Sequence, residues 1–349
     1  MKVRFGVYIG IELSLPHRST VGKFQELVKV IDGYGIDAIA TYDSSFVGTD
    51  AYVRATLIAE AASHAQVGIH PTNPITREPQ IMTGFLGAID ALTEGRAFLS
   101  MGSGDSAVYN IGKKAATRAR MEDYITCIQD LLATGEATYD GRPQRIRWAP
   151  DAVRDHVPIV LCAEGPKTLH LGGRICDGVI AGTGLSPEVI DDTKARIHGG
   201  AAAEGRNPED VEVWFTARSA LHEDREIAHE NVYAFVSSIL NHSMRFGFEE
   251  KHVPGQFRDA VQQYVDDYEL YEHIQDGGSN PKHMQDLGLT DYAMERFALA
   301  GNPKDWIERI EELAARGATN LWINAERQSL DEQIHYMKLF GEEILPDFQ

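Results

Sequence analysis

The chain has 349 residues, of which 43% are hydrophobic and 24% are charged. These proportions are typical of a packed soluble protein and exclude a disordered or fibrous chain. Lysine and arginine number 33 against 52 aspartate and glutamate residues, which gives a formal net charge of −19. Because so acidic a surface repels phosphate backbones and anionic lipids, we expect neither nucleic acid nor a membrane as a partner.

The sequence favours a cytoplasmic location. No apolar run reaches the roughly 18 residues that a membrane span needs, and the apolar N-terminus lacks the features of a secretory signal. The three cysteines, Cys127, Cys162 and Cys176, are an odd number without C-x-x-C spacing. We therefore expect no disulfide framework and no metal site, with each cysteine serving as a small buried apolar side chain in a reducing compartment.

Short apolar runs alternate with helix-like segments along most of the chain. The predicted strands are Val3–Ile9, Asp37–Thr41, Gln66–His70, Arg96–Met101, Pro158–Ala163, Gly178–Ala181, Val211–Ala217 and Thr319–Asn324. The helices that follow them are predicted at Lys23–Tyr34, Tyr52–Ser63, Gln80–Leu92, Arg118–Leu132, from Lys167 onward, and at Pro187–Ala202, Ile227–Leu240 and Leu330–Phe340. This alternation predicts parallel strands, which can close without leaving a sheet edge. The sequence thus favours one α/β domain over residues 1–349, a (β/α)8 TIM barrel with insertions, over an open doubly wound sheet.

Two segments interrupt the alternation. Residues 134–150 contain Asp140-Gly141 between short β-like stretches, which predicts a hairpin. Residues 245–291 are longer and rich in aromatic side chains, with Gly247 and Gly277-Gly278 as candidate hinges. A long insertion of this kind is typical of a lid over an active site or of an interface in a homo-oligomer, and both interpretations remain open.

Polar or glycine-rich clusters follow five of the predicted strands, which is where a barrel of this type carries its active site. They occupy residues 41–45, 70–77, 102–106, 163–168 and 182–184. Glycine lets a backbone approach a flat ring closely, and the N–H groups at a helix start favour anions such as phosphate. No G-x-G-x-x-G follows the first strand, and neither a P-loop nor H-E-x-x-H occurs, so a Rossmann unit, a P-loop nucleotide site and a metalloprotease are disfavoured.

Three sequence blocks in order carry a family resemblance: TNPITREP, ALTEGRAFLSMGSGDS and VPIVLCAEGPKTLHLGGRICDGVIAGTG. Together with the later block ALAGNPKDWIERIEELAARGATNLWI, they resemble the bacterial-luciferase-like flavin enzymes. Within that family the chain is most similar to the methylenetetrahydromethanopterin reductase branch. The resemblance covers about residues 3–240 and the later block, and it implies a barrel that holds an isoalloxazine-type ring at its C-terminal mouth.

The resemblance also implies roles for particular loops. A non-prolyl cis peptide within Ile69–Asn73 would press a bulge against the ring. The polar edge of the ring would bond to Thr72 and Asn73, and the ring or its ribityl chain would lie against Gly102, Ser103 and Gly104. The ribityl chain and its phosphate would be held by Glu164, Gly165, Pro166, Gly182, Thr183 and Gly184. The residues themselves support the last group, because a Ser-Pro pair at a helix start follows directly.

Three side chains in these loops are candidates for catalysis. Asp43 can accept a hydrogen bond from the ring or substrate, or it caps the next segment. His70 can donate a proton, or it is a buried histidine satisfied by a backbone carbonyl, and Tyr109 lies within reach of the pocket. Histidines also occur in or beside the long insertion, where irregular spacing argues against a metal site and solvent exposure is expected: His242, His252, His273 and His283.

We interpret the chain as a flavin-dependent oxidoreductase, most simply a two-component monooxygenase that uses reduced FMN and oxygen on a small organic substrate. A separate flavin reductase would then be a partner. The first alternative is hydride transfer with an 8-hydroxy-5-deazaflavin coenzyme, towards which TNPITREP and GSGD lean. The second is a non-catalytic flavin-binding protein, which the aromatic-rich insertion disfavours. All three place a flavin-type ring at the barrel mouth.

Overall fold

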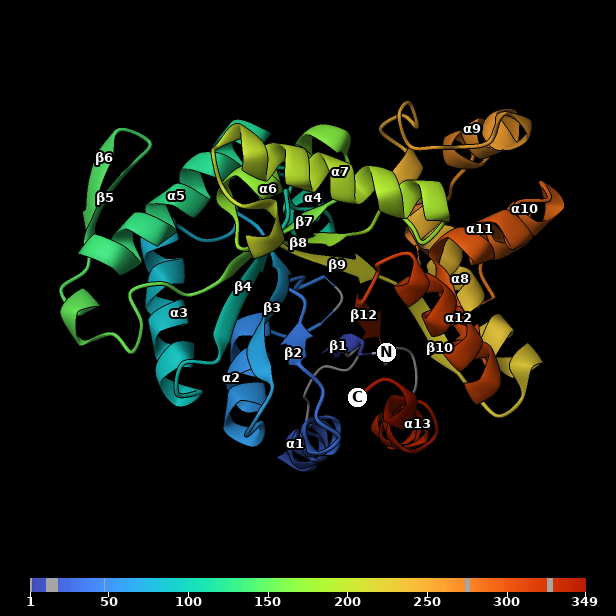
Figure 1. Ribbon diagram of the computed structural model, residues 1–349, viewed down its shortest axis with the longest axis horizontal. Helices are drawn as coiled ribbons and strands as arrows, with labels where there is room; N and C mark the ends of the chain where they lie inside the picture. The colour runs from blue at the N-terminus through green and yellow to red at the C-terminus, as the bar shows by residue number, and fades with distance from the viewer. Residues whose placement is uncertain (1, 11–17, 47, 274–276, 325–328) are drawn as a thin grey trace.

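The computed structural model describes residues 2–10, 18–46, 48–273, 277–324 and 329–349. Parallel strands close into a barrel in the order β1-β12-β9-β8-β7-β4-β3-β2 (Figure 1). They are β1 (Arg4–Tyr8), β2 (Ala38–Thr41), β3 (Gln66–Thr72), β4 (Ala97–Met101), β7 (Ile159–Ala163), β8 (Gly178–Ala181), β9 (Glu212–Thr216) and β12 (Asn320–Asn324). Each coincides with a predicted strand to within two residues at either end. The predicted (β/α)8 barrel is confirmed.

Helices surround the barrel and bury one face each against it. They are α1 (Arg18–Gly33), α2 (Ala51–Ala61), α3 (Pro79–Leu92), α5 (Arg118–Thr134), α6 (Pro166–Ile175), α7 (Pro187–Ala203), α12 (Pro303–Ala315) and α13 (Leu330–Glu343). Local sequence explains several starts: Asp50 caps α2, and Asn302 and Ser329 open α12 and α13 with capping boxes. Within the described ranges, no helix is long and apolar enough to cross a membrane.

The inside of the barrel is filled by side chains. Its inner cluster consists of Tyr8, Ala38, Ala40, Phe98, Val160, Ile180, Trp214 and Trp322. The Trp322 indole lies against Gly6, where an added Cβ would stand 2.6 Å from the ring, and Gly68 faces Phe98 in the same way. Large rings fit here because the neighbouring strands carry glycine. Trp214 and Trp322 are therefore core residues, and this layer closes the bottom of the barrel mouth.

Residues 134–150 contain an antiparallel hairpin. Its strands are β5 (Glu136–Tyr139) and β6 (Arg142–Arg145), joined by Asp140 and Gly141 with φ angles of 52° and 70°. Both positive angles match the turn type that Asp-Gly favours between paired strands. The hairpin projects from one end of the molecule, at the left of Figure 1.

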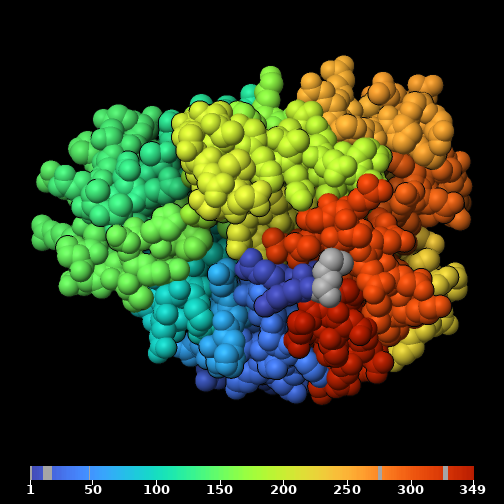
Figure 2. Space-filling view, in the orientation of Figure 1, coloured from blue at the N-terminus to red at the C-terminus, as the bar shows by residue number. Residues whose placement is uncertain are grey.

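A second apolar core lies at the other end of the molecule. It involves the parallel pair β10 (Arg218–Leu221) and β11 (Ala298–Gly301) and the helices α8 (Arg225–Met244), α9 (Arg258–Asp266), α10 (Ser279–Asp286) and α11 (Thr290–Phe297). The helices α9 to α11 form the orange protrusion at the upper right of Figure 2. The helix predicted at 227–240 is α8, but it belongs to this second core. The main core instead contains Trp306 and Ile310 of α12, which contacts α13.

The long insertion predicted at 245–291 falls into two parts. Residues 245–251 border the large cavity described below, together with Gln262 and His273. Val253, Val261, Tyr264, Met284 and Leu289 are buried in the second core instead. Residues 274–276 lie outside the described residues. The choice between a lid and a subunit interface stays a prediction, but most of the segment is packed against α8.

Candidate active site

A large cavity opens at the carboxyl ends of the barrel strands. Its volume is about 1410 Å³, and its lining comes from the strand ends, the loops that follow them, and α8 with the segment after it. Most small-molecule sites occupy roughly 300–1,000 Å³. The cavity is therefore large enough for a flavin-sized ring system and a substrate, at the position where barrel enzymes carry their active sites.

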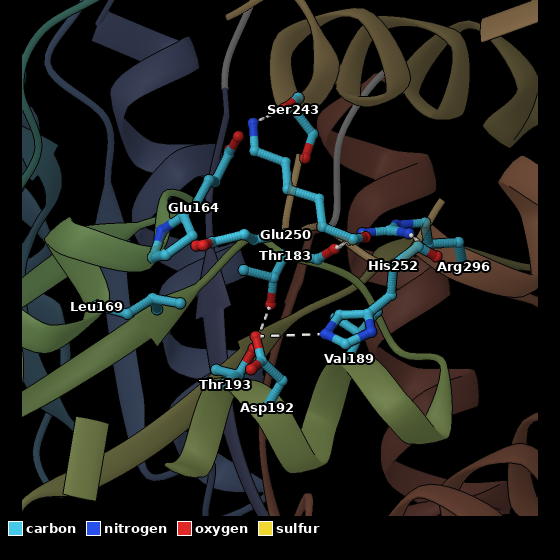
Figure 3. Close-up of a pocket in the computed structure, with 12 residues that line it drawn as sticks. Glu164, Leu169, Thr183, Val189, Asp192, Thr193, Ser243, Glu250, His252 and Arg296 are labelled. Atoms are coloured by element: carbon cyan, nitrogen blue, oxygen red, sulfur yellow. Dashed lines mark hydrogen bonds and ion pairs between the residues drawn. The ribbon is translucent and has the colours of Figure 1, made fainter. Parts of the chain in front are cut away.

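Most of the predicted site residues line this cavity: Asp43, His70, Thr72, Asn73, Gly102, Ser103, Gly104, Tyr109, Glu164, Gly165, Pro166 and Gly182. Thr183 faces an adjacent small pocket of about 10 Å³, where its hydroxyl lies 2.9 Å from that of Thr193 (Figure 3). Gly184 has φ +120° and packs against Arg296, whose Cγ would lie 2.7 Å from an added Cβ. Of residues 182–184, Gly182 lines the large cavity and Thr183 the small one, so phosphate binding by this loop stays a prediction.

The loop at 182–184 is fixed by Arg296 of α11. This guanidinium is buried, and its Nη2 donates to the carbonyl oxygens of Thr183 at 3.0 Å and Lys251 at 2.7 Å. Its Nη1 donates to the Tyr292 hydroxyl at 3.0 Å. Because buried donors are costly when unpaired, these bonds hold the second core firmly against a barrel loop. The position that a Cβ at residue 184 would occupy is filled by Arg296.

Asp43 and Thr72 lie on one wall of the cavity, and the buried hydroxyl of Tyr52 contacts both; we call these three residues the hydroxyl wall. The Thr72 hydroxyl donates to Asp43 Oδ2 at 2.8 Å, and the Tyr52 hydroxyl lies 3.1 Å from the same oxygen. Burial, followed by the charge of Asp43, raises the pKa of Tyr52 far above its usual range, so the phenol remains a donor. Arg77 stacks on the Tyr52 ring with 3.2 Å to its centroid. Asp43 is thus held in one orientation by two hydroxyl groups.

β3 ends in a bulge beside this wall. Its register with β4 shifts between Ile69 and Thr72, and the His70–Pro71 peptide bond is cis. The bulge lies where the resemblance implies one, but the cis bond precedes proline, which corrects the expectation of a non-prolyl bond; proline is the residue that commonly allows the cis form. The side-chain oxygen of Asn73 accepts two backbone N–H groups of the following turn, at 3.0 and 3.1 Å. Its carbonyl end therefore holds the loop rather than a ligand.

His70 lies at the bottom of the cavity as a neutral side chain. Its ring centroid is 4.6 Å from that of Trp322, and its Nδ1 lies 3.0 Å from Ser100 Oγ and 3.2 Å from Cys162 Sγ. Burial, with a smaller effect of the Arg218 charge, lowers the pKa of His70 to about 3. A group that is unprotonated at neutral pH is a poor proton donor. Cys162 also departs from the sequence expectation, because it lines the cavity.

A second wall, which we call the charged wall, consists of Arg245, Asp105, His242 and Glu164. Arg245 Nη2 lies 2.8 Å from Asp105 Oδ1, and His242 Nδ1 lies 2.9 Å from Asp105 Oδ2. The other ring nitrogen, His242 Nε2, lies 3.3 Å from Glu164 Oε1. Asp105 precedes α4 (Ser106–Tyr109), Glu164 follows β7, and the two basic residues end α8. The charged wall therefore joins three separate elements by contacts between opposite charges.

The electrostatics of the charged wall favour a protonated imidazole. Burial alone would raise the pKa of Asp105, but His242 and Arg245 outweigh it and lower that pKa well below its usual range. Burial would lower the pKa of His242, yet Glu164 and Asp105 raise it above its ordinary value. Burial lowers the pKa of His273, another cavity histidine, to about 4. His242 thus differs from both His70 and His273, because its pKa is raised whereas theirs are lowered.

The expectation that His242 is an exposed loop residue is wrong. The helix predicted to end at Leu240 continues to Met244, and its residues Phe235, Ser238, Ile239 and His242 all line the cavity. These positions follow one face of a helix. The sequence carries this signal, since the same periodicity extends past Leu240, but the predicted helix ends four residues before the observed one.

The residues present fit a flat, ring-bearing cofactor with an anionic tail. Thr72 and the amide end of Asn73 stand beside the bulge, and Gly102 presents only backbone to the cavity. α6 begins at Pro166, and its N-cap Gly165 makes no side-chain cap bond, so the helix start can receive an anion. Among the described residues no group of His, Cys, Asp and Glu suited to a metal ion is found.

The barrel, the bulge and the cavity define a cofactor-dependent (β/α)8 enzyme. Residues 3–320 match the family model described as luciferase-like monooxygenase, and the chain belongs to this family. The resemblance seen in the sequence is confirmed, and the chain is an oxidoreductase.

Individual relatives differ in their chemistry. The chain is 26% identical over 333 residues to the 5,10-methylenetetrahydromethanopterin reductase of Methanolobus tindarius, covering 93% of this chain and 95% of the relative. The coenzyme F420-dependent tetrahydromethanopterin reductase of Methanopyrus kandleri has a TM-score of 0.77 at 22% identity, over 100% of both chains. The oxygenating constituent of 3,6-diketocamphane monooxygenase from Pseudomonas putida, solved with FMN, has a TM-score of 0.67 at 14% identity, over 100% and 99%. Similar proteins thus use a deazaflavin or FMN.

Proposed function

We propose that this chain transfers a hydride between a deazaflavin coenzyme of the F420 type and a small organic substrate. The observation that carries the proposal is the charged wall, in which His242 lies between Asp105 and Glu164 on the cavity surface and these carboxylates raise its pKa. Adding a hydride to a polarised double bond leaves negative charge on a heteroatom, so the reaction needs a proton source nearby. The full-length similarity to a methylenetetrahydromethanopterin reductase supports the same chemistry.

The hydroxyl wall and the glycine loops would hold the coenzyme. Its ring would face Thr72, the amide end of Asn73 and the backbone at Gly102, while its anionic tail would run towards the start of α6 at Gly165. When bound, the coenzyme supplies the two-electron hydride carrier. The protein's own part is to orient the ring through the fixed Asp43–Thr72 pair, to bind the substrate beside it and to hold a proton.

A monooxygenase that uses reduced FMN is the second candidate. One observation favours it: the bottom of the cavity carries the buried, neutral ring of His70, which lies against the ring of Trp322. Dry surroundings protect reactive oxygen intermediates from side reactions. The charged wall argues against this candidate, because four ionic side chains on the same cavity attract water. Under this alternative a separate flavin reductase would be required as a partner.

Anaerobic turnover distinguishes the two candidates. The protein is mixed with F420 and a panel that includes methylenetetrahydromethanopterin, sugar phosphates and secondary alcohols, with and without oxygen. The proposal predicts a change in the coenzyme spectrum that needs substrate but not oxygen. Turnover that occurs only with reduced FMN and oxygen, and that adds an oxygen atom to the product, would contradict it.

A further inference from the structure

His242 has the arrangement of an oriented proton-exchange group. Asp105 binds its Nδ1 at 2.9 Å, which fixes the ring and leaves Nε2 pointing at Glu164. The Nε2–Glu164 distance of 3.3 Å lies beyond the usual 2.7–3.2 Å of a good N–H···O bond, so this contact is the weaker one. The side chain is 32% exposed and lines the cavity, where a ligand can reach it.

We propose that His242 is the proton donor of the active site, with Asp105 as its positioning residue and Glu164 as the partner that a substrate heteroatom displaces from Nε2. This inference rests on the proposed hydride transfer. It names a residue on α8, outside the strand-end loops where the sequence placed the catalytic candidates. It also explains why charged side chains lie together on the cavity surface, which packing alone does not require.

The groups around His242 keep it charged without tying it to a single partner. Those that face it or its carboxylates are Asp105 after β4, Glu164 after β7, Arg245 at the C-cap of α8, Lys251 after α8, and Tyr268 and His273 after α9. Two carboxylates contact the ring directly, and Arg245 is shared with Asp105. Since opposite charges close by favour the charged form, the imidazole stays protonated while Asp105 stays ionised.

The proton balance of the step is simple. In the reducing direction a bound, reduced deazaflavin would supply the hydride for a new C–H bond, while the π bond of a C=O or C=N group would break and its electron pair would move to the heteroatom. The Nε2–H bond of His242 then breaks as the heteroatom–H bond forms, which leaves a neutral imidazole. Solvent returns the proton through the open cavity. In the oxidising direction the neutral imidazole accepts the same proton.

Two substitutions separate the roles of the ring nitrogens. His242→Asn places an amide near the position of Nδ1 and retains a donor for Asp105, while His242→Gln reaches towards Nε2 but cannot hold a transferable proton. We expect both variants to lose roughly 10²–10⁴-fold in kcat, the range of general acid catalysis, with F420 binding unchanged. His64→Asn is the matched control, because His64 pairs with Asp32 at 3.3 Å outside the cavity lining.

The protonation of His242 is measured without any substrate. In protein labelled at the histidine rings, the NMR titration of His242, assigned with His242→Asn, should give a pKa above 6.5. Asp105→Asn and Glu164→Gln should each lower it, and in Glu164→Gln the basic limb of the kcat profile should move to lower pH.

A pKa at or below 6.5 in the unaltered protein would overturn the proposal, whatever the activity assays show. Full kcat in His242→Asn would overturn it equally, even if the pKa is raised. If no substrate is reduced with F420 while the pKa is raised and carboxylate-dependent, the proposed function fails and the assignment of His242 as the proton-holding group stands.

Discussion

The two walls of the cavity use polar side chains in opposite ways. The hydroxyl wall links Asp43 to Thr72 and Tyr52 through short bonds from neutral donors, and neutral His70 lies below it. The charged wall links Asp105 and Glu164 to the cation of His242. Hydroxyl donors fix geometry without losing a proton near neutral pH, whereas an imidazolium between carboxylates can give up a proton. We therefore propose that the hydroxyl wall binds the ring and that the charged wall exchanges the proton.

The largest effect expected from this contrast is acid destabilisation through His70. The pKa of His70 is depressed to about 3 in the folded protein, against 6.5 for an ordinary histidine. Between these two pH values the unfolded chain binds a proton at this histidine and the folded chain does not. The unfolding free energy therefore falls as pH drops from 6.5 towards 3, by on the order of 4 kcal/mol. Urea unfolding at several pH values measures the loss. His70→Gln should reduce the slope over that window, and an unchanged slope would contradict a neutral buried His70.

At the charged wall, protonation of His242 should change the unfolding free energy in the opposite direction. The pKa of His242 is raised, so its contribution to stability is complete below 6.5 and is lost as pH rises through the higher folded value. As pH rises above neutral, urea unfolding should show a decline in the unfolding free energy of the unaltered protein, and His242→Asn should abolish this decline. A decline of equal size in both proteins would show that His242 is not its source.

A smaller loss of unfolding free energy is expected when a bond of the hydroxyl wall is removed. Thr72→Val removes the bonds to Asp43 and Tyr52 and should cost about 1–2 kcal/mol of unfolding free energy, with weaker F420 binding. Thr193→Val is the matched control, because it removes one neutral bond to Thr183 in the adjacent small pocket. It should lower stability by a similar amount and leave F420 binding intact. Equal weakening of coenzyme binding in both variants would count against ring binding at Thr72.

The smallest effect is expected at the rim of the cavity. Tyr109 is 43% exposed at the end of α4, and a change of an exposed side chain usually alters stability by less than about 0.5 kcal/mol. Tyr109→Phe should therefore leave unfolding unchanged. Steady-state kinetics then test the prediction that Tyr109 is catalytic, since a catalytic hydroxyl predicts a clear fall in kcat, and normal kinetics would remove Tyr109 from the candidates.

The barrel strands were predictable because fully buried parallel strands are short apolar runs whose ends are marked by polar residues. Gly182 and Glu164 were found for the same reason, as they follow such runs directly. The contacts of His242 with Asp105 and Glu164 could not be predicted, because both residues are distant in sequence and periodicity reports only local structure. The close approach of Arg296 to Gly184 could not be predicted, because Arg296 belongs to the second core and is distant in sequence.

The second core was missed for a related reason. β10 and β11 are four residues each and pair with one another across the long insertion, so neither resembles an independent strand. α8 has the apolar character of a barrel helix, but it packs on this pair. Tertiary pairing, rather than local propensity, decides where such elements lie.

The most direct test of deazaflavin-dependent hydride transfer is a pair of anaerobic titrations of the purified protein, one with F420 and one with FMN. Absorbance and fluorescence follow the binding of each to the same preparation. The proposed function predicts saturable binding of F420 with a Kd at least about tenfold lower than that of FMN, a difference of roughly 1.4 kcal/mol. Tighter binding of FMN, or no binding of F420, would contradict it.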